Sequence, residues 1–362
     1  MITRVSRIFI LALLSSVMCA EGKLSAPFST SADAAGLIQD SPVTQLLDNA
    51  QAGIRRGDLA GAAVALEQAL ALEKGNKTAR MALINVLMRL TRWAEAEQHA
   101  QILRQQFPDE TGSFYFLALI AFQRGQLPVA LEMANHCLER GDRRSEVYKL
   151  LALIEYLLQQ YDKFEAHIRE TIKLNPTDAD AYYHLGRYYF EDKRYKDALG
   201  AFQTTFKIQP AHYKAHYYAG LLHEGENDGE RVKQEYQAAI QIIELQKIRY
   251  PWPFTDLGKW LVNEGEYDRG VGWLYRATRN DPTSPHAWYH YAKALFQNGA
   301  SFEVKEAILE AIRLDPGYSE AYYLLARYYQ KTGEDRLSKE TFAKFDDLKK
   351  NPIPSPYGLR RW

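Results

Sequence analysis

Residues 178–210 read DADAYYHLGRYYFEDKRYKDALGAFQTTFKIQP, and their pattern recurs along almost the whole chain at a spacing of 34 residues. The recurring positions hold small and apolar residues, here Tyr182, Leu185, Gly186, Tyr189, Ala198, Phe202 and Pro210. A fixed period of this length indicates an array of stacked repeats rather than one closed core. Such an array usually serves as a surface that holds something else.

Each copy contains two sets of apolar residues with helical spacing. The first set lies at offsets 0, 3, 4 and 7 between Tyr182 and Tyr189, which is one face of a helix. The second set includes Ala198 and Phe202, and Pro210 ends it because proline cannot donate to the preceding turn. One copy is therefore predicted to be a helix–turn–helix pair whose apolar faces need neighbours to cover them.

At these positions the chain resembles the tetratricopeptide repeat (TPR) family, whose unit has a W-x2-L-G-x2-Y…A-x3-F…P pattern. The repeats begin at Val43, Lys77, Thr111, Ser145, Ala179, Tyr213, Pro251, Pro285 and Ser319. The resemblance covers about 43–350. It implies an all-α, right-handed superhelical solenoid of about nine helix–turn–helix units, with the first helix of each unit lining a concave groove.

The spacing changes once, between the sixth and seventh repeats. The seventh repeat is expected at Lys247, but it matches best from Pro251, and four extra residues are close to one helical turn. We therefore predict a second helix lengthened over Val232–Tyr250 and stopped by the segment 251–253. The predicted blocks are repeats one to six over 43–246 and repeats seven to nine over 247–350.

The N-terminus has the pattern of a secretory signal peptide. Arg4 and Arg7 precede the apolar residues 8–14, and smaller residues follow up to Ala20. We predict a signal peptide over 1–20, a flexible spacer over 21–42, an exported protein (periplasmic or secreted), and no membrane span after cleavage. The alternatives are an uncleaved N-terminal anchor that tethers the chain to a membrane, and acylation of Cys19. The Pro-rich residues 351–362 are expected to form a tail.

Composition and motifs argue against several classes of function. Equal numbers of basic and acidic residues, 45 of each, argue against a nucleic-acid binder. No Gly-rich phosphate loop appears, and the His223-Glu224 start of a zinc-protease motif has Asn227 in place of the second histidine. We therefore predict no catalysis, no cofactor and no metal.

Several smaller motifs have plain structural interpretations. The pairs His212/His216 and His286/His290 have i,i+4 spacing, but no third metal ligand follows, so an enzyme or metal protein built on them is the least favoured hypothesis. Cys137 is expected to be a small buried residue. The two Arg-Gly-Asp sequences, at 56–58 and 140–142, are expected to be helix caps.

A second stripe on the first helices is aliphatic at the N-terminal end, then aromatic, then aromatic and basic. The predicted groove residues are Tyr115, Tyr183, Arg187, Phe190, Tyr217, Lys259, Tyr289, Lys293, Phe296, Tyr323 and Arg327. Rigid rings give contact area at low entropic cost, and neighbouring cations orient an anion. The predicted function is a protein-interaction scaffold that binds another protein or an extended peptide, of which an acidic one fits.

Two alternatives remain open for this stripe. A glycan can lie flat on the same tyrosines, which is typical of a carbohydrate-binding or polysaccharide-export accessory protein. Tyrosines and cations at i,i+4 can also simply stack on one another. The carboxylate clamp of the family is not transferred to this chain, because Met81 and Tyr115 stand where lysine is expected.

Overall fold

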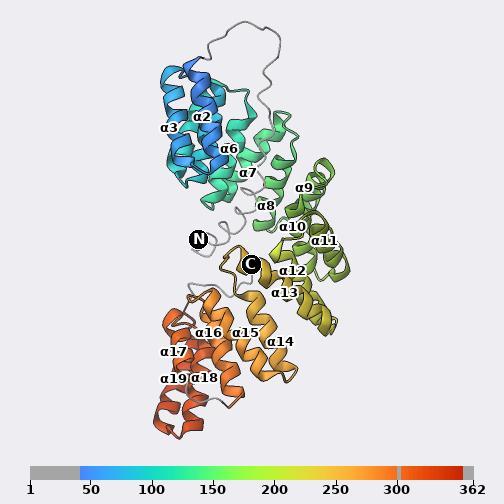
Figure 1. The fold of residues 1–362 in the computed structure, drawn as a ribbon, viewed down its shortest axis with the longest axis vertical. Helices are drawn as coiled ribbons and strands as arrows, with labels where there is room; N and C mark the ends of the chain where they lie inside the picture. The colour runs from blue at the N-terminus through green and yellow to red at the C-terminus, as the bar shows by residue number, and fades with distance from the viewer. Residues whose placement is uncertain (1–40, 300–302, 354–362) are drawn as a thin grey trace. The chain divides into compact units, whose positions relative to one another are not determined.

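The computed structural model describes residues 41–299 and 303–353, and every regular element within them is an α-helix (Figure 1). The predicted signal peptide, the Cys19 alternative, most of the spacer and most of the C-terminal tail lie outside these ranges. The helices α2 to α19 form nine consecutive pairs. This confirms the predicted all-α repeat solenoid.

The first helix of every pair begins within one residue of a predicted repeat start. The first helices are α2 (Pro42–Arg56), α4 (Lys77–Arg89), α6 (Thr111–Gln123), α8 (Ser145–Leu157), α10 (Ala179–Glu191), α12 (Tyr213–Gly225), α14 (Trp252–Asn263), α16 (Pro285–Gln297) and α18 (Ser319–Thr332). The second helices are α3 (Leu59–Leu72), α5 (Trp93–Gln106), α7 (Leu127–Glu139), α9 (Tyr161–Leu174), α11 (Tyr195–Ile208), α13 (Gly229–Leu245), α15 (Tyr267–Asn280), α17 (Val304–Leu314) and α19 (Asp335–Lys350).

The turn inside every pair has the same backbone geometry. One residue adopts a positive φ in each pair, namely Gly57, Thr91, Gly125, Gln159, Lys193, Asn227, Gly265, Gly299 and Gly333. In eight of these pairs the next residue then donates its amide hydrogen back into the first helix, as Arg92 N does to Leu87 O at 2.9 Å. This left-handed end satisfies carbonyls that the helix leaves without partners and turns the chain towards the second helix.

Small residues allow the two helices of a pair to cross closely. A Cβ atom on Gly186 would lie 2.7 Å from the ring of Phe202, and one on Gly220 would lie 2.5 Å from the ring of Tyr236. Both distances are shorter than van der Waals contact. The large ring on the second helix therefore fits only because the first-helix residue is a glycine without a side chain.

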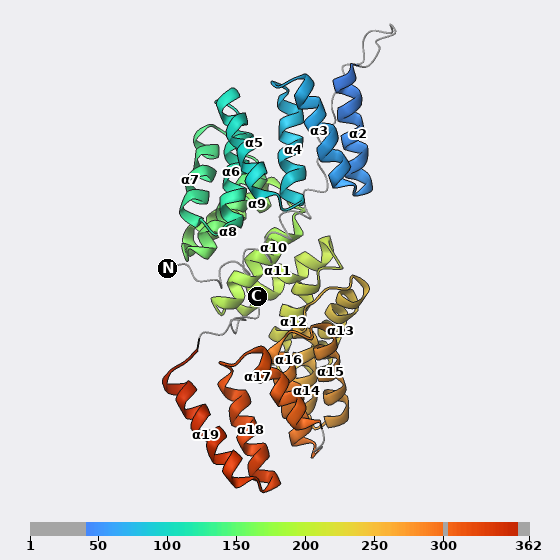
Figure 2. The same cartoon turned by 90° about the vertical axis from the view of Figure 1, so that its left-hand side faces the viewer.

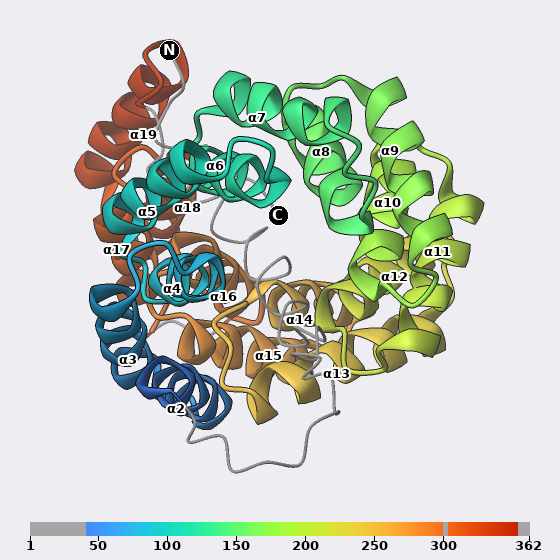
Figure 3. The ribbon, with the colours of Figure 1, turned by 90° about the horizontal axis from the view of Figure 1, so that it is seen from above.

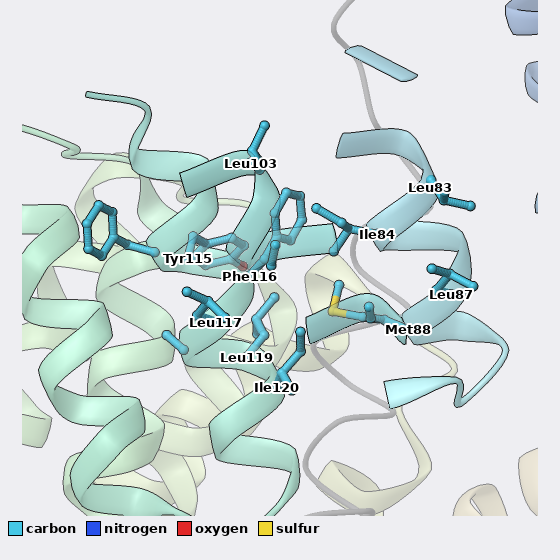
Figure 4. Close-up of a cluster of buried hydrophobic side chains, with 14 of the residues drawn as sticks. Leu83, Ile84, Leu87, Met88, Leu103, Tyr115, Phe116, Leu117, Leu119 and Ile120 are labelled. Carbon is cyan, nitrogen blue, oxygen red and sulfur yellow. The ribbon is translucent and has the colours of Figure 1, made fainter. Parts of the chain in front are cut away.

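The chain divides into two compact halves, and the division falls between Ala181 and Tyr182 in the sequence of α10. We refer to them as the N-terminal half and the C-terminal half. In the N-terminal half the core runs through α4, α5 and α6, where Leu83, Leu103 and Phe116 are among the buried side chains (Figure 4). In the C-terminal half, the largest fully buried side chains are aromatic, including Tyr217 and Tyr236.

First helices of successive pairs touch one another. In the N-terminal half α4 contacts α6 and α6 contacts α8 (Figure 3), and in the C-terminal half α14 contacts α16 and α16 contacts α18. Figure 2 shows α18 beside its partner α19, the last helix of the array. The three helices α14, α16 and α18 therefore form a continuous row, which we call the first-helix row.

The change of spacing between repeats six and seven lies at α13, with one correction to the prediction. Helix α13 has 17 residues, more than the 14 of α11, but it spans Gly229–Leu245 rather than 232–250. A left-handed residue, Lys247 with φ 54°, follows its end. The segment 251–253 does not stop α13; it begins α14, because proline is tolerated in a first helical turn.

Candidate functional site

All eleven predicted groove residues lie on first helices, but the structure exposes them to different extents. Three are exposed: Lys293, Tyr323 and Arg327. Four are half-buried: Phe190, Lys259, Tyr289 and Phe296. Four are buried: Tyr115, Tyr183, Arg187 and Tyr217. The accessible members are therefore concentrated on α16 and α18.

Tyr217 is a structural residue rather than a contact residue. Its side chain is fully buried, and its hydroxyl donates a 2.8 Å hydrogen bond to Oδ2 of Asp256 on α14. The other oxygen of Asp256 accepts from Nζ of Lys259 at 2.8 Å. This network joins repeats six and seven across the point where their spacing changes. The prediction that Tyr217 faces a ligand is corrected, because the side chain has no accessible surface.

Tyr183, Arg187 and Tyr115 are also corrected, because stacking buries them. Tyr183 lies 4.6 Å from the ring of His212, and the guanidinium of Arg187 lies 6.0 Å from the ring centroid of Tyr183. Tyr115 is covered in a similar way, by the guanidinium of Arg144 at 5.3 Å. At these three positions the packing alternative describes the side chains better than a ligand track does.

Aromatic side chains gather near the N-terminal ends of the helices in the first-helix row. The ring of Trp252 lies 4.5 Å from His286, and the ring of Tyr289 lies 5.0 Å from Tyr318. Burial raises the pKa of the Tyr318 and Tyr289 hydroxyls, with Glu320 contributing to both shifts, so both rings stay neutral. Trp252 and Tyr318 were not in the predicted groove. The sequence feature that could have identified both residues is their position, because each is an aromatic residue at or next to the first turn of a first helix.

The four histidines of the two pairs have contacts typical of packing and helix capping. His286 and His290 lie 4.3 Å apart in ring-to-ring contact, and His212 accepts the amide hydrogen of Ala215 as a helix cap. His216 stacks on Phe206 at 4.2 Å. Within residues 41–299 and 303–353 no group of three or more His, Cys, Asp and Glu side chains is arranged to hold a metal ion. The pairs are explained by packing and capping.

Several cations on the first helices form ion pairs. Lys149 pairs with Asp178 at 2.8 Å, Arg187 with Glu191 at 3.4 Å and Lys259 with Asp256 at 2.8 Å.

Lys293, Arg327 and Lys331 form no ion pair with any described carboxylate. Arg327 donates to the Tyr323 hydroxyl at 3.3 Å, and Lys331 Nζ lies 5.0 Å from the ring centroid of Phe296. Sequence reasoning missed Lys331, although it follows Arg327 by one helical turn.

Two remaining motifs are structural. Cys137 is fully buried, and burial raises the pKa of its thiol to about 12, so it is not a reactive nucleophile. The carboxylate of Asp142, in the second Arg-Gly-Asp sequence, is buried and bound by Arg144 at 2.7 Å. Asp58, in the first, caps α3 by accepting from the amide of Gly61 at 2.9 Å. Among the described helices, none is long and apolar enough to cross a membrane.

Comparison with known sequences finds the tetratricopeptide repeat. One family model with that description matches residues 54–120, and a second matches 167–200 and 307–338. Superkiller protein 3 of Schizosaccharomyces pombe is 23% identical over 61% of this chain and 17% of its own length. Anaphase-promoting complex subunit 3 of the same organism is 22% identical over 76% of this chain and 41% of its own length. The chain thus spans less than half the length of these curated relatives.

Comparison with solved structures finds the same fold. The anaphase-promoting complex hetero-tetramer Cut9–Hcn1 matches with a TM-score of 0.58 at 12% identity, covering 79% of this chain and 55% of the solved chain. The structure of pilF from Pseudomonas aeruginosa matches with a TM-score of 0.52 at 16% identity, covering 60% and 97%. The family-model matches identify tetratricopeptide repeats in this chain, and the solved structures show the same all-α repeat fold.

Proposed function

We propose that this protein is a non-catalytic scaffold that holds an extended segment of a partner protein along its first-helix row. The observation that carries the proposal is the surface of α16 and α18. There Tyr289, Phe296 and Tyr323 are half-buried or exposed, and Lys293 and Arg327 are exposed beside them. Rings held by packing offer contact area without losing much entropy on binding.

The dimensions of the row suit a short stretch of chain. Packed helices lie about 8–10 Å apart, so the three helices of the row span about 20 Å. An extended chain advances about 3.3 Å per residue, so about six residues cross that distance. The row therefore fits a linear peptide segment better than a folded domain, whose surface would have to match the row in shape.

The relatives support a role in assembly at the level of the family. One is a subunit of the anaphase-promoting complex, and one solved neighbour is a hetero-tetramer of that complex. Repeat arrays present long surfaces on a rigid frame, which suits binding more than chemistry. The pattern over residues 1–20 supports the further proposal that this scaffold is exported and works outside the cytoplasm.

Site-specific photo-cross-linking tests the proposal. A photoreactive phenylalanine analogue replaces Tyr289 or Tyr323 on first helices, and in control variants it replaces Tyr195 or Leu309, which are exposed on second helices. We expect the same protein to be captured from both first-helix positions and from neither control. Equal capture at all four positions, or capture of carbohydrate alone, would contradict a protein-binding first-helix row.

A further inference from the structure

Cations at equivalent positions of the repeats differ in whether a carboxylate neutralises them. Arg187, Lys259, Lys293 and Arg327 occupy the same place in repeats five, seven, eight and nine. The first two are each paired with a carboxylate on their own helix, Glu191 and Asp256. The last two have no carboxylate partner among the described residues.

The composition of the two helices explains the difference. Helix α16 contains no Asp or Glu at all, and α18 contains only Glu320, in its first turn. The Glu320 carboxylate accepts a hydrogen bond from the Ser319 hydroxyl at 3.0 Å. Arg327 and Lys331 lie two and three turns further along α18, so the carboxylate is remote from them. Along α16 and α18 three exposed cations therefore face a single distant carboxylate.

Aromatic residues support these cations without cancelling their charge. Arg327 donates to the Tyr323 hydroxyl, and Lys331 lies over the Phe296 ring. Contacts of this kind order the cations and leave their full positive charge in place. Side chains ordered in this way lose less entropy when an anion binds, and an uncompensated positive surface accelerates encounter with negative partners.

We infer that the segment bound on α16 and α18 is acidic, with Lys293, Arg327 and Lys331 contacting its carboxylates and Tyr289, Phe296 and Tyr323 contacting the intervening side chains. The inference rests on the proposed function and specifies its partner by charge. It also places the acidic segment on repeats eight and nine, because the paired cations of repeats five and seven are less available to a negative ligand.

Three fluorescent peptides that differ only in charge test the inference on the full chain. Each has about twelve residues, enough to cross both helices, and repeats the triplet Glu-Tyr-Ala, Gln-Tyr-Ala or Lys-Tyr-Ala. We expect fluorescence anisotropy to show the Glu peptide binding about tenfold tighter than the Gln peptide at about 50 mM salt. The difference should largely disappear at about 500 mM salt, where surface charges are screened.

A matched pair of variants assigns the effect to these residues. The triple variant K293Q/R327Q/K331Q should lose the preference for the Glu peptide. The control K196Q/K207Q/R279Q removes the same number of exposed charges from second helices and should keep it. Circular dichroism should give both variants the unfolding temperature of the unchanged chain, since these side chains are exposed and make no ion pair with a described carboxylate.

The outcomes separate the two proposals. Equal binding of the Glu and Gln peptides contradicts the acidic partner and leaves the extended-segment scaffold standing. Binding of none of the three peptides contradicts both. If heparin or an RNA oligonucleotide binds more tightly than the Glu peptide and is lost in the same triple variant, the surface is a general polyanion site and the inference is wrong.

Discussion

The two halves of the chain share one repeat pattern, but some of the same positions are buried in the first half and accessible in the second. In the N-terminal half, α6 is buried at every residue from Gly112 to Phe122, and the stripe cation Lys149 is locked to Asp178. In the C-terminal half, the equivalent faces of α16 and α18 carry half-buried rings and exposed cations. The comparison teaches that the spacing decides which face a residue lies on. Its neighbours decide whether that residue packs or binds.

The largest expected contrast between the halves lies at a matched aromatic pair. Phe122 and Phe296 occupy the same position of repeats three and eight, but Phe122 is fully buried and Phe296 is half-buried. We expect Phe122→Ala to lower the free energy of unfolding by about 3–5 kcal/mol because it leaves a cavity, and Phe296→Ala by about 1–2 kcal/mol. Urea denaturation measures both, and equal losses would remove the contrast.

A second matched pair concerns charge. Both side chains of the Lys149–Asp178 pair are under a tenth exposed, at 6% and 8%. Lys149→Met leaves the Asp178 carboxylate buried without its partner, and we expect a loss of about 3 kcal/mol in unfolding free energy. Lys293→Met should change stability by less than about 0.5 kcal/mol, because Lys293 is exposed. Thermal unfolding compares the two variants. An equal loss of unfolding free energy would mean that Lys293 contributes as much to stability as Lys149 and would contradict the contrast.

Alkaline pH should affect the C-terminal half selectively. Burial raises the pKa of Tyr250, Tyr289, Tyr291 and Tyr318, which all belong to this half. Their protonated form is favoured by the folded state, so this stability is complete below about pH 10, the unfolded value. It is lost as pH rises above that value.

Hydrogen exchange at increasing pH can follow this loss. We expect α14 to α18 to lose protection before α4 to α8. Simultaneous loss of protection in both groups of helices, or loss that begins well below pH 10, would contradict the assignment to these tyrosines.

The smallest expected effect lies in the turns. Thr91 is β-branched and has a φ of 58°, a conformation that glycine adopts at the same place in other repeats. Thr91→Gly should stabilise the protein by up to about 1 kcal/mol, because it relieves this strain. The control Gly333→Thr should destabilise by a similar amount. Differential scanning calorimetry resolves both, and a lower unfolding temperature for Thr91→Gly would show that the strain is negligible.

Much of the architecture could be predicted from the sequence because it depends on local periodicity. The helical spacing and the 34-residue period place the nine first helices of the described residues to within one residue. The predicted end of α13 is wrong, because Lys247 adopts a left-handed conformation that the identity of a lysine does not predict. The segment 251–253 was then assigned to the wrong helix.

The site was harder to predict because exposure depends on residues far away in the sequence. Tyr217 is buried with Asp256, 39 residues later, and no spacing rule connects the two. Tyr183 and Tyr289 follow the same pattern, yet His212 covers the first, and the second stays partly accessible. Lys331, by contrast, could have been found by extending the stripe one further turn along α18.

The left-handed residue in each turn bears on how such proteins are detected. It occurs in all nine pairs, while its side chain varies between Gly, Thr, Gln, Lys and Asn. The family models reported above match three stretches of this chain, 54–120, 167–200 and 307–338. The dihedral angle is thus a more faithful marker of the turn inside each repeat than any amino acid. Counting such angles in coordinates should recover diverged repeats whose sequences have lost the signature.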